Sequence, residues 1–150
     1  MKLMVINGPN LNLLGVREPE IYGAETYAML LEKIKAHALM HGIEVECVQS
    51  NHEGMLVDEI QRAFFEKFDG IVMNPGAYTH TSIALLDALK ATNLPCVEVH
   101  ISDPDTRESF RHISYVRVAC IATVAGKGTN GYLEAMDILS EHIENHGKKV

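Results

Sequence analysis

The sequence predicts an α/β protein built on a five-stranded parallel sheet. Short apolar runs alternate with amphipathic helical stretches along the whole chain, and strands appear as continuous apolar runs when helices cover both faces of a sheet. Right-handed crossovers then give a flavodoxin-like, doubly wound fold with strand order 2-1-3-4-5. No repeat, linker or shift in composition divides the 150 residues, so we expect a single flavodoxin-like domain over residues 1–150.

The first half of the chain alternates strand and helix between clear stop signals. Gly42 ends the first long helical stretch, and the Asp69-Gly70 pair ends the second. The predicted elements of this half are a strand at Leu3–Ile6, a helix at Glu25–His41, a strand at Ile43–Gln49, a helix at Gly54–Phe68 and a strand at Gly70–Met73.

The second half repeats the same alternation. Ile83, Leu86 and Leu89 recur at helical spacing, and Pro95 closes the turn beyond that helix. The predicted elements are a helix at Ser82–Ala91, a strand at Cys96–Ile101, a short turn or helix at Asp105–His112, a strand at Val116–Val124 and a helix at Asn130–His146.

Composition excludes several classes of protein. The net charge of −7 argues against a general nucleic-acid partner, although a locally positive site can still bind an anion. No apolar run approaches the roughly 20 residues of a membrane helix, and the first residues lack a secretory signal, so we expect a cytoplasmic protein. The cysteines, Cys47, Cys96 and Cys120, are odd in number and lack paired spacing, which favours buried free thiols over disulfides or a zinc site.

A long loop follows the first strand and is a candidate lid. Residues 7–23, NGPNLNLLGVREPEIYG, are rich in Gly, Pro and Asn and precede any helical pattern. Loops of this length are uncommon in compact domains and are often lids or binding loops. The loop carries Arg17 and Tyr22. A phenol has a pKa of about 10, so a phenolate base needs a nearby cation, and arginine always supplies one.

Two further segments should meet this loop, because ligands of such sheets bind at the carboxyl ends of the strands. One is the stretch that follows the third strand, and the other contains the end of the fourth strand. Glu98 lies two residues before His100, on the same strand face, where it could orient the imidazole. The three segments together supply Asn10, Arg17, Tyr22, Asn74, His80, Glu98, His100, Ser102 and Arg111.

Each of these residues also has an ordinary structural interpretation. Asn10 and Asn74 are turn residues, His80 could start a helix, and His100 could be a core histidine. Asp87 has the spacing of a solvated helix face. His80, His100 and His112 lack the spacing of metal ligands, and no G-x-S-x-G elbow indicates a serine hydrolase.

Two alternatives to an acid–base enzyme stay open. The first is a binding or signalling module that uses the same sheet edge without chemistry. The second is a dinucleotide oxidoreductase, because residues 126–131 match G-x-G-x-x-G between a strand and a helix. That fingerprint belongs to the first βαβ unit, however, and a Gly-rich turn that enters a helix accounts for the match.

The motifs together resemble the type II 3-dehydroquinate dehydratase family. The resemblance runs from the first strand through Tyr115, with a weaker continuation beyond it. The matching stretches are NGPNLNLLGVREPEIYG at 7–23, QSNHEG at 49–54, NPGAYTHTS at 74–82, VEVHIS at 97–102, RESFRHISY at 107–115 and, more weakly, GKGTNGY at 126–132.

The resemblance implies a lyase of the shikimate pathway of aromatic amino acid biosynthesis. Such an enzyme converts 3-dehydroquinate to 3-dehydroshikimate by anti elimination through an enolate. It also implies a dodecamer built as a tetramer of trimers, with no metal, cofactor or Schiff-base lysine. The implied catalytic residues are Tyr22 as base, Arg17 as its activator, Asn10 as holder of a water on the enolate oxygen, His100 as acid and Glu98 as its orienting group.

The resemblance also implies a set of substrate contacts. Asn74 and the backbone N–H groups of Ile101 and Ser102 would hold the carboxylate. His80 and Arg111 would bind ring hydroxyls, and Asp87 would reach in from a neighbouring subunit. Two residues depart from the family pattern: Asp103 stands where Asn is more usual, and Lys127 where an apolar residue is usual. Asp103 would place a charge beside the carboxylate unless its side chain caps the next turn.

Overall fold

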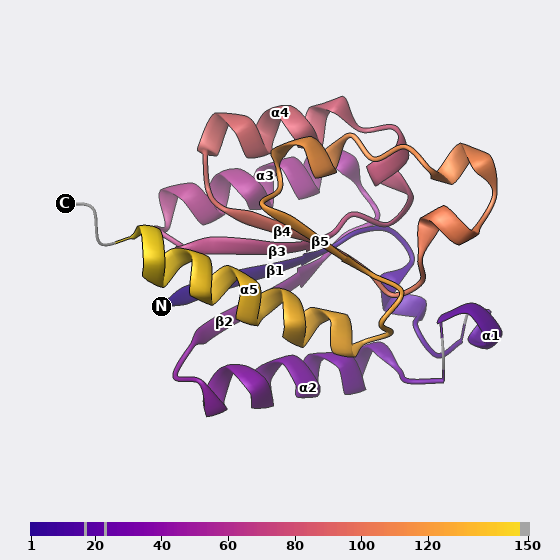
Figure 1. Cartoon of the computed structure of the whole chain (residues 1–150), viewed down its shortest axis with the longest axis horizontal. Helices are drawn as coiled ribbons and strands as arrows, with labels where there is room; N and C mark the ends of the chain where they lie inside the picture. Colours follow the sequence, from indigo (N-terminus) through magenta and orange to yellow (C-terminus); the bar gives the residue numbers. More distant parts are fainter. Residues whose placement is uncertain (17, 23, 148–150) are drawn as a thin grey trace.

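A parallel sheet of five strands in the order β2-β1-β3-β4-β5 runs through the protein (Figure 1). The computed structural model describes residues 1–16, 18–22 and 24–147, and only the backbone of Tyr22. The predicted strand order is confirmed. The strands are β1 Lys2–Asn7, β2 Glu44–Gln49, β3 Gly70–Asn74, β4 Cys96–His100 and β5 Ala122–Ala125.

Helices cover both faces of the sheet. Helices α2 and α5 lie on one face, and α3 and α4 lie on the other (Figure 1). The helices are α1 Pro19–Tyr22, α2 Tyr27–Met40, α3 Glu53–Phe65, α4 Ile83–Thr92 and α5 Asn130–His146. None of the described helices is long and apolar enough to cross a membrane.

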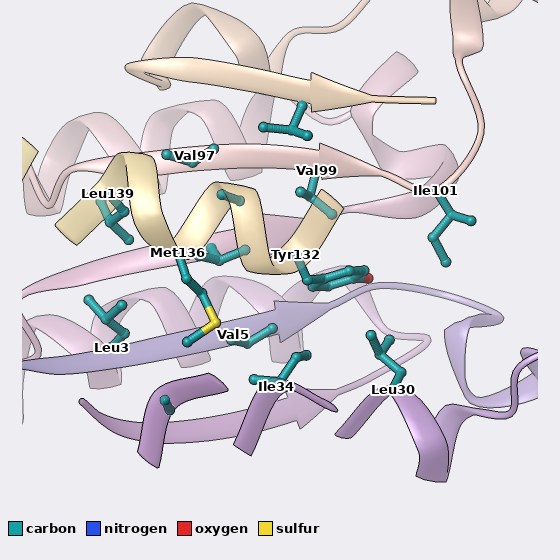
Figure 2. Packing of buried hydrophobic residues seen from close by; sticks show 14 of the residues in the cluster. Leu3, Val5, Leu30, Ile34, Val97, Val99, Ile101, Tyr132, Met136 and Leu139 are labelled. Carbon is teal, nitrogen blue, oxygen red and sulfur yellow. The ribbon is translucent and has the colours of Figure 1, made fainter. Parts of the chain in front are cut away.

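The central strands are buried on both faces, which explains their continuous apolar runs. Leu3 and Val5 of β1 point into the cluster beneath α2 and α5, whereas Met4 and Ile6 point into the cluster beneath α3 and α4. Figure 2 shows the first cluster, with Tyr132, Met136 and Leu139 of α5 among the strand side chains. Each large apolar side chain buried in this way contributes roughly 1.5–3 kcal/mol.

The helix ends follow local rules that the sequence only partly reveals. The Thr26 and Ser82 hydroxyls accept hydrogen bonds from the N–H groups of Met29 and Leu85, at 3.1 and 3.0 Å, and so begin α2 and α4. Helix α3 ends three residues before the predicted Phe68. Lys67 adopts a positive φ of 61°, and the Phe68 N–H bonds back to the Ala63 carbonyl while its ring is buried.

The structure adds detail at α4 and contradicts the last predicted strand. The buried residues of α4 are Leu85, Ala88 and Leu89, whereas Ile83 is 54% exposed. The strand predicted at Val116–Val124 is instead a 3-10 helix, Val116–Ala119, followed by the short β5. Val116 is buried against the α3–α4 side and Val118 points outward, so this apolar run does not lie in the sheet.

The cysteines are free thiols, as predicted, although only Cys96 is fully buried. The loop 7–23 is less irregular than expected. It contains a 3-10 turn at Leu11–Leu13 and the single-turn helix α1.

Candidate active site

A pocket opens at the carboxyl edge of the sheet, where the segments after β1, β3 and β4 meet. It contains seven of the residues that the sequence singled out: Asn10, Asn74, His80, His100, Ile101, Ser102 and Arg111. The remaining wall comes from neighbours in the same segments, namely Pro9, Leu11, Leu14, Gly76, Ala77, Pro104 and Arg107.

Four predicted residues stand apart from this pocket wall. Arg17 and the side chain of Tyr22 lie outside the described residues. Asp87 is exposed on α4 and does not line the pocket, so a role for it requires a second subunit. Glu98 lies behind His100 and is completely buried.

Glu98 and His100 form a buried pair at the end of β4. His100 Nε2 lies 2.7 Å from Glu98 Oε1, and the two side chains project from the same face of the strand. His100 is 7% exposed and lines the pocket. Its Nδ1 has no hydrogen-bond partner among the described residues, so this nitrogen is available to a ligand.

The Glu98 carboxylate is held by donors from four separate segments. Its Oε1 accepts hydrogen bonds from the hydroxyls of Thr79 and Ser114, at 2.5 and 2.7 Å. Its Oε2 accepts from Arg117 Nε at 3.3 Å and from the Thr123 hydroxyl at 3.2 Å. The sequence did not identify these four residues, because they lie at no regular sequence spacing from Glu98.

These contacts keep the buried carboxylate charged. Burial alone raises the pKa of a carboxyl group, but the hydrogen bonds and charge of His100, together with the hydrogen bonds of Thr79 and Ser114, lower the pKa of Glu98 to about 2. An ionised Glu98 accepts the His100 N–H and fixes the orientation of the ring. The pair therefore fits a general acid.

Asn74 is fixed by a second buried chain of hydrogen bonds. Its Nδ2 donates to the Tyr132 hydroxyl at 2.9 Å, and Tyr132 donates to Asn7 Oδ1 at 2.7 Å. Its Oδ1 accepts from the Gly76 N–H at 3.1 Å. These two contacts distinguish Asn74 Nδ2 from Oδ1. The second Nδ2 hydrogen has no partner among the described residues and can bind a ligand.

The Gly-rich turn at 126–131 braces the end of β4. The N–H groups of Gly126 and Gly128 donate to the carbonyls of His100 and Ile101, at 3.3 and 3.1 Å. A trans peptide places its C=O and N–H on opposite sides, so the N–H groups of Ile101 and Ser102 point away from this turn. Adjacent N–H groups aimed the same way form an anion-binding concavity.

The two departures from the family pattern have structural explanations. The Asp103 carboxylate accepts the Asp105 N–H at 3.0 Å and so caps the 3-10 turn Pro104–Thr106; it does not line the pocket. Lys127 is exposed and pairs with Glu134 on α5 at 2.7 Å. Neither residue interferes with the pocket.

His80 and Arg111 form the outer wall of the pocket. His80 Nδ1 lies 2.7 Å from the Ile113 carbonyl, and Arg111 Nε lies 2.8 Å from Glu108 Oε2. Both side chains are thus held in place by residues of the 107–115 stretch. An imidazole and a guanidinium at this position suit polar or anionic groups of a ligand.

The loop 7–23 is anchored at both ends. At its start, Asn10 adopts a positive φ of 69°, and its N–H donates to Asn51 Oδ1 at 3.1 Å. Just beyond its other end, Glu25 accepts hydrogen bonds from Lys33 at 3.1 Å and from Thr129 at 2.9 Å. The 49–54 stretch and the Gly-rich turn therefore act as the two attachment points of the loop.

Fold and pocket define a flavodoxin-like α/β protein with a polar, acid–base site at the carboxyl edge of its sheet. The dehydroquinase class II family model matches residues 1–140. The 3-dehydroquinate dehydratase of Clostridium perfringens (strain 13 / Type A) is 54% identical over 145 residues, covering 97% of this chain and 99% of that protein. The enzyme of Ruegeria pomeroyi is 48% identical over 147 residues, covering 98% of both.

Solved structures agree with the sequence comparison. The type II dehydroquinase from Butyrivibrio crossotus superposes with a TM-score of 0.92 at 52% identity, covering 93% of this chain and 97% of that chain. The chain therefore belongs to the dehydroquinase class II family, and the family prediction is confirmed.

Proposed function

We propose that this chain dehydrates 3-dehydroquinate to 3-dehydroshikimate in the shikimate pathway, by anti elimination through an enolate. Family membership supports the substrate and the reaction. The observation that supports the proposed chemistry is the buried Glu98–His100 pair: His100 lines the pocket, and its Nδ1 has no hydrogen-bond partner among the described residues. As a biosynthetic enzyme it would act in the cytoplasm.

The first step is removal of a proton next to the substrate ketone. Tyr22, as a phenolate activated by Arg17, takes the C2 proton, and the C–H electron pair moves into the ketone to form the enolate. A water held by Asn10 stabilises the enolate oxygen. Asn10 lines the pocket, whereas the base and its activator are assigned from the family resemblance.

The second step is loss of the C1 hydroxyl. As the ketone reforms, the electron pair of the enolate carbon–carbon bond forms the C1=C2 double bond and the C1–O bond breaks, while His100 donates a proton from Nδ1 so that the hydroxyl leaves as water. The Glu98 carboxylate on Nε2 orients the ring for this transfer. The proton taken by Tyr22 then replaces the one lost from His100 through solvent, and the cycle closes.

Substrate binding uses the groups around these two residues. The carboxylate meets the N–H groups of Ile101 and Ser102 and the free Nδ2 hydrogen of Asn74, and the ring hydroxyls meet His80 and Arg111. Asp87 would complete the site from a neighbouring subunit of a dodecamer, a tetramer of trimers. No step needs a metal, a cofactor or a lysine Schiff base.

The decisive experiment follows the conjugated enone of 3-dehydroshikimate by ultraviolet absorbance. Wild-type protein should produce it from 3-dehydroquinate, and Tyr22→Phe should bind substrate without turnover. Tyr115→Phe serves as the matched control and should retain activity. Borohydride added with substrate should leave the enzyme active. Failure of the folded wild-type protein to form the enone would overturn the proposed function, and covalent trapping on a lysine would overturn the mechanism.

A further inference from the structure

A cluster of possible metal ligands lies at the opposite edge of the sheet from the pocket. Helix α2 ends beside α5 just before the chain enters β2 (Figure 1). His37 Nε2 on α2 lies 2.7 Å from Asp137 Oδ1 on α5. His41 is one turn beyond His37, and the centroids of the two rings are 4.4 Å apart. One ligand atom from each of His37, His41 and Asp137 lies within 4.8 Å of the others.

This donor set matches the preferences of zinc and similar ions. Two imidazole nitrogens and one carboxylate oxygen are common ligands of Zn²⁺, and histidines at i and i+4 on a helix can bind one ion together. His41 and Asp137 are exposed, so their side chains can rotate toward an ion held by the less exposed His37. The set does not include His80, His100 or His112.

The surroundings of the cluster also favour a cation. The last turn of α2 carries the partial negative charge of a helix C-terminus. A hollow beside it is lined by Met1, His41, Gly42, Ile43, Asp137, Ser140, Glu141 and Glu144. Its three carboxylates outnumber the α-amino group of Met1, and no described lysine or arginine lines it. Glu141 follows Asp137 by one turn of α5 and lines the same hollow. The Ser140 hydroxyl oxygen is buried and has no hydrogen-bond partner among the described residues.

We propose that His37, His41 and Asp137 form a binding site for a divalent transition-metal ion of the Zn²⁺ class, which links α2 to α5. The ion replaces the proton shared between His37 and Asp137, and Glu141 or water completes a tetrahedral site. An ion that binds only the folded protein stabilises it. The site is far from the pocket, so the proposal does not depend on the proposed reaction.

The test measures Zn²⁺ binding to metal-stripped protein by calorimetry, together with the shift of the thermal unfolding midpoint on adding Zn²⁺. His41→Ala and Asp137→Asn should each weaken binding by at least about tenfold and remove the rise in the unfolding midpoint. The matched control is His142→Ala, since His142 and His146 form a second close histidine pair, on α5, and no carboxylate among the described residues groups with them as a ligand.

The outcomes separate a built site from adventitious binding. Loss of Zn²⁺ affinity in His41→Ala and Asp137→Asn, with His142→Ala unchanged, supports the site. Equal affinity in all four proteins, or loss only in His142→Ala, overturns it. Turnover of metal-stripped His41→Ala should equal that of metal-stripped wild type, which distinguishes this site from the pocket. Failure of wild-type protein to bind Zn²⁺ also overturns the proposal.

Discussion

The 2.7 Å contact between Glu98 Oε1 and His100 Nε2 leaves the other ring nitrogen of His100 without a described partner. The contact fixes both the orientation of the ring and the atom that can deliver a proton. The same carboxylate gathers hydroxyls from three other segments and one guanidinium. The proposed acid is therefore positioned by the packing of the whole carboxyl edge, not by its neighbour alone.

Glu98→Gln should lower kcat by at least about tenfold with little change in KM. A positioned general acid contributes about 10²–10⁴-fold, and a neutral amide holds the His100 ring less firmly than a charged carboxylate does. The measurement is steady-state turnover as a function of pH, with Thr123→Val as the control, since it removes one donor to the carboxylate but keeps the charge. Unchanged kcat and pH profile in Glu98→Gln would contradict the positioning role.

Glu98 should also make the fold sensitive to acid. Burial raises its pKa, but its hydrogen bonds, led by that of His100, lower it from 4.5 to about 2. Because the folded-state pKa is the lower one, the stabilisation is complete above pH 4.5 and is lost as the pH falls toward 2. A pKa difference of this size corresponds to roughly 3 kcal/mol.

The measurement is the free energy of unfolding in urea at pH 7, 5, 4 and 3. Wild-type protein and a variant at the exposed Glu44, Glu44→Gln, should lose stability along the same curve. Glu98→Gln should be less stable at pH 7 and lose less between pH 5 and 3. Parallel curves for wild type and Glu98→Gln would show that this carboxyl does not govern acid sensitivity.

The fold was predictable because the apolar pattern is strong and consistent. Continuous apolar strands that alternate with long amphipathic helices predict a doubly wound sheet, for which 2-1-3-4-5 is a common order, and the last helix lies where predicted, at Asn130–His146. The failures have local causes. A short apolar run such as that after Tyr115 has no periodicity that separates a strand from a 3-10 turn. The turn at Lys67 depends on a positive φ angle, which a lysine in the sequence does not predict.

The sequence predicted the site residues that directly follow a strand. It did not predict the residues that hold Glu98 by hydrogen bonds from other segments. Asn74, His100 and Ser102 converge because parallel strands end at one edge. Thr79, Ser114 and Thr123 meet on Glu98 only through tertiary packing. The turn at 126–131 has a nucleotide-binding pattern, but two of its N–H groups are bonded to the carbonyls of β4 and the adjoining residue. Asp87 stays a prediction that needs a partner subunit.

Tyr132→Phe should weaken both substrate binding and the fold. Its hydroxyl links Asn74 to Asn7 inside the core, and each buried polar group left without a partner costs about 1–3 kcal/mol of stability. Without it, Asn74 Nδ2 loses the contact that aims its second hydrogen at the substrate carboxylate. We expect a severalfold rise in KM and a lower unfolding midpoint, measured on folded protein against Tyr115→Phe. A KM equal to that of the control would exclude this positioning role.

Gly126→Ala should raise KM more than Gly128→Ala, although both substitutions strain a left-handed residue. The φ angles are +76° and +61°, and an L-residue in this region costs about 1–2 kcal/mol, so the two variants should lose similar stability. The two positions differ in the room around the new side chain. A Cβ on Gly126 would lie 3.2 Å from Asp103 Cβ, whereas a Cβ on Gly128 meets nothing within 4 Å.

The crowding at Gly126 should affect the pocket, because Asp103 directly follows Ile101 and Ser102, whose N–H groups are proposed to hold the substrate carboxylate. A shift of Asp103 away from the new Cβ would also displace Ser102. Loss of the hydrogen bond from the Gly126 N–H to the His100 carbonyl would make the end of β4 more mobile. Steady-state kinetics and urea unfolding of both variants decide the matter. If KM rises equally in the two at equal stability, the turn acts on the fold as a whole and not on the carboxylate contact.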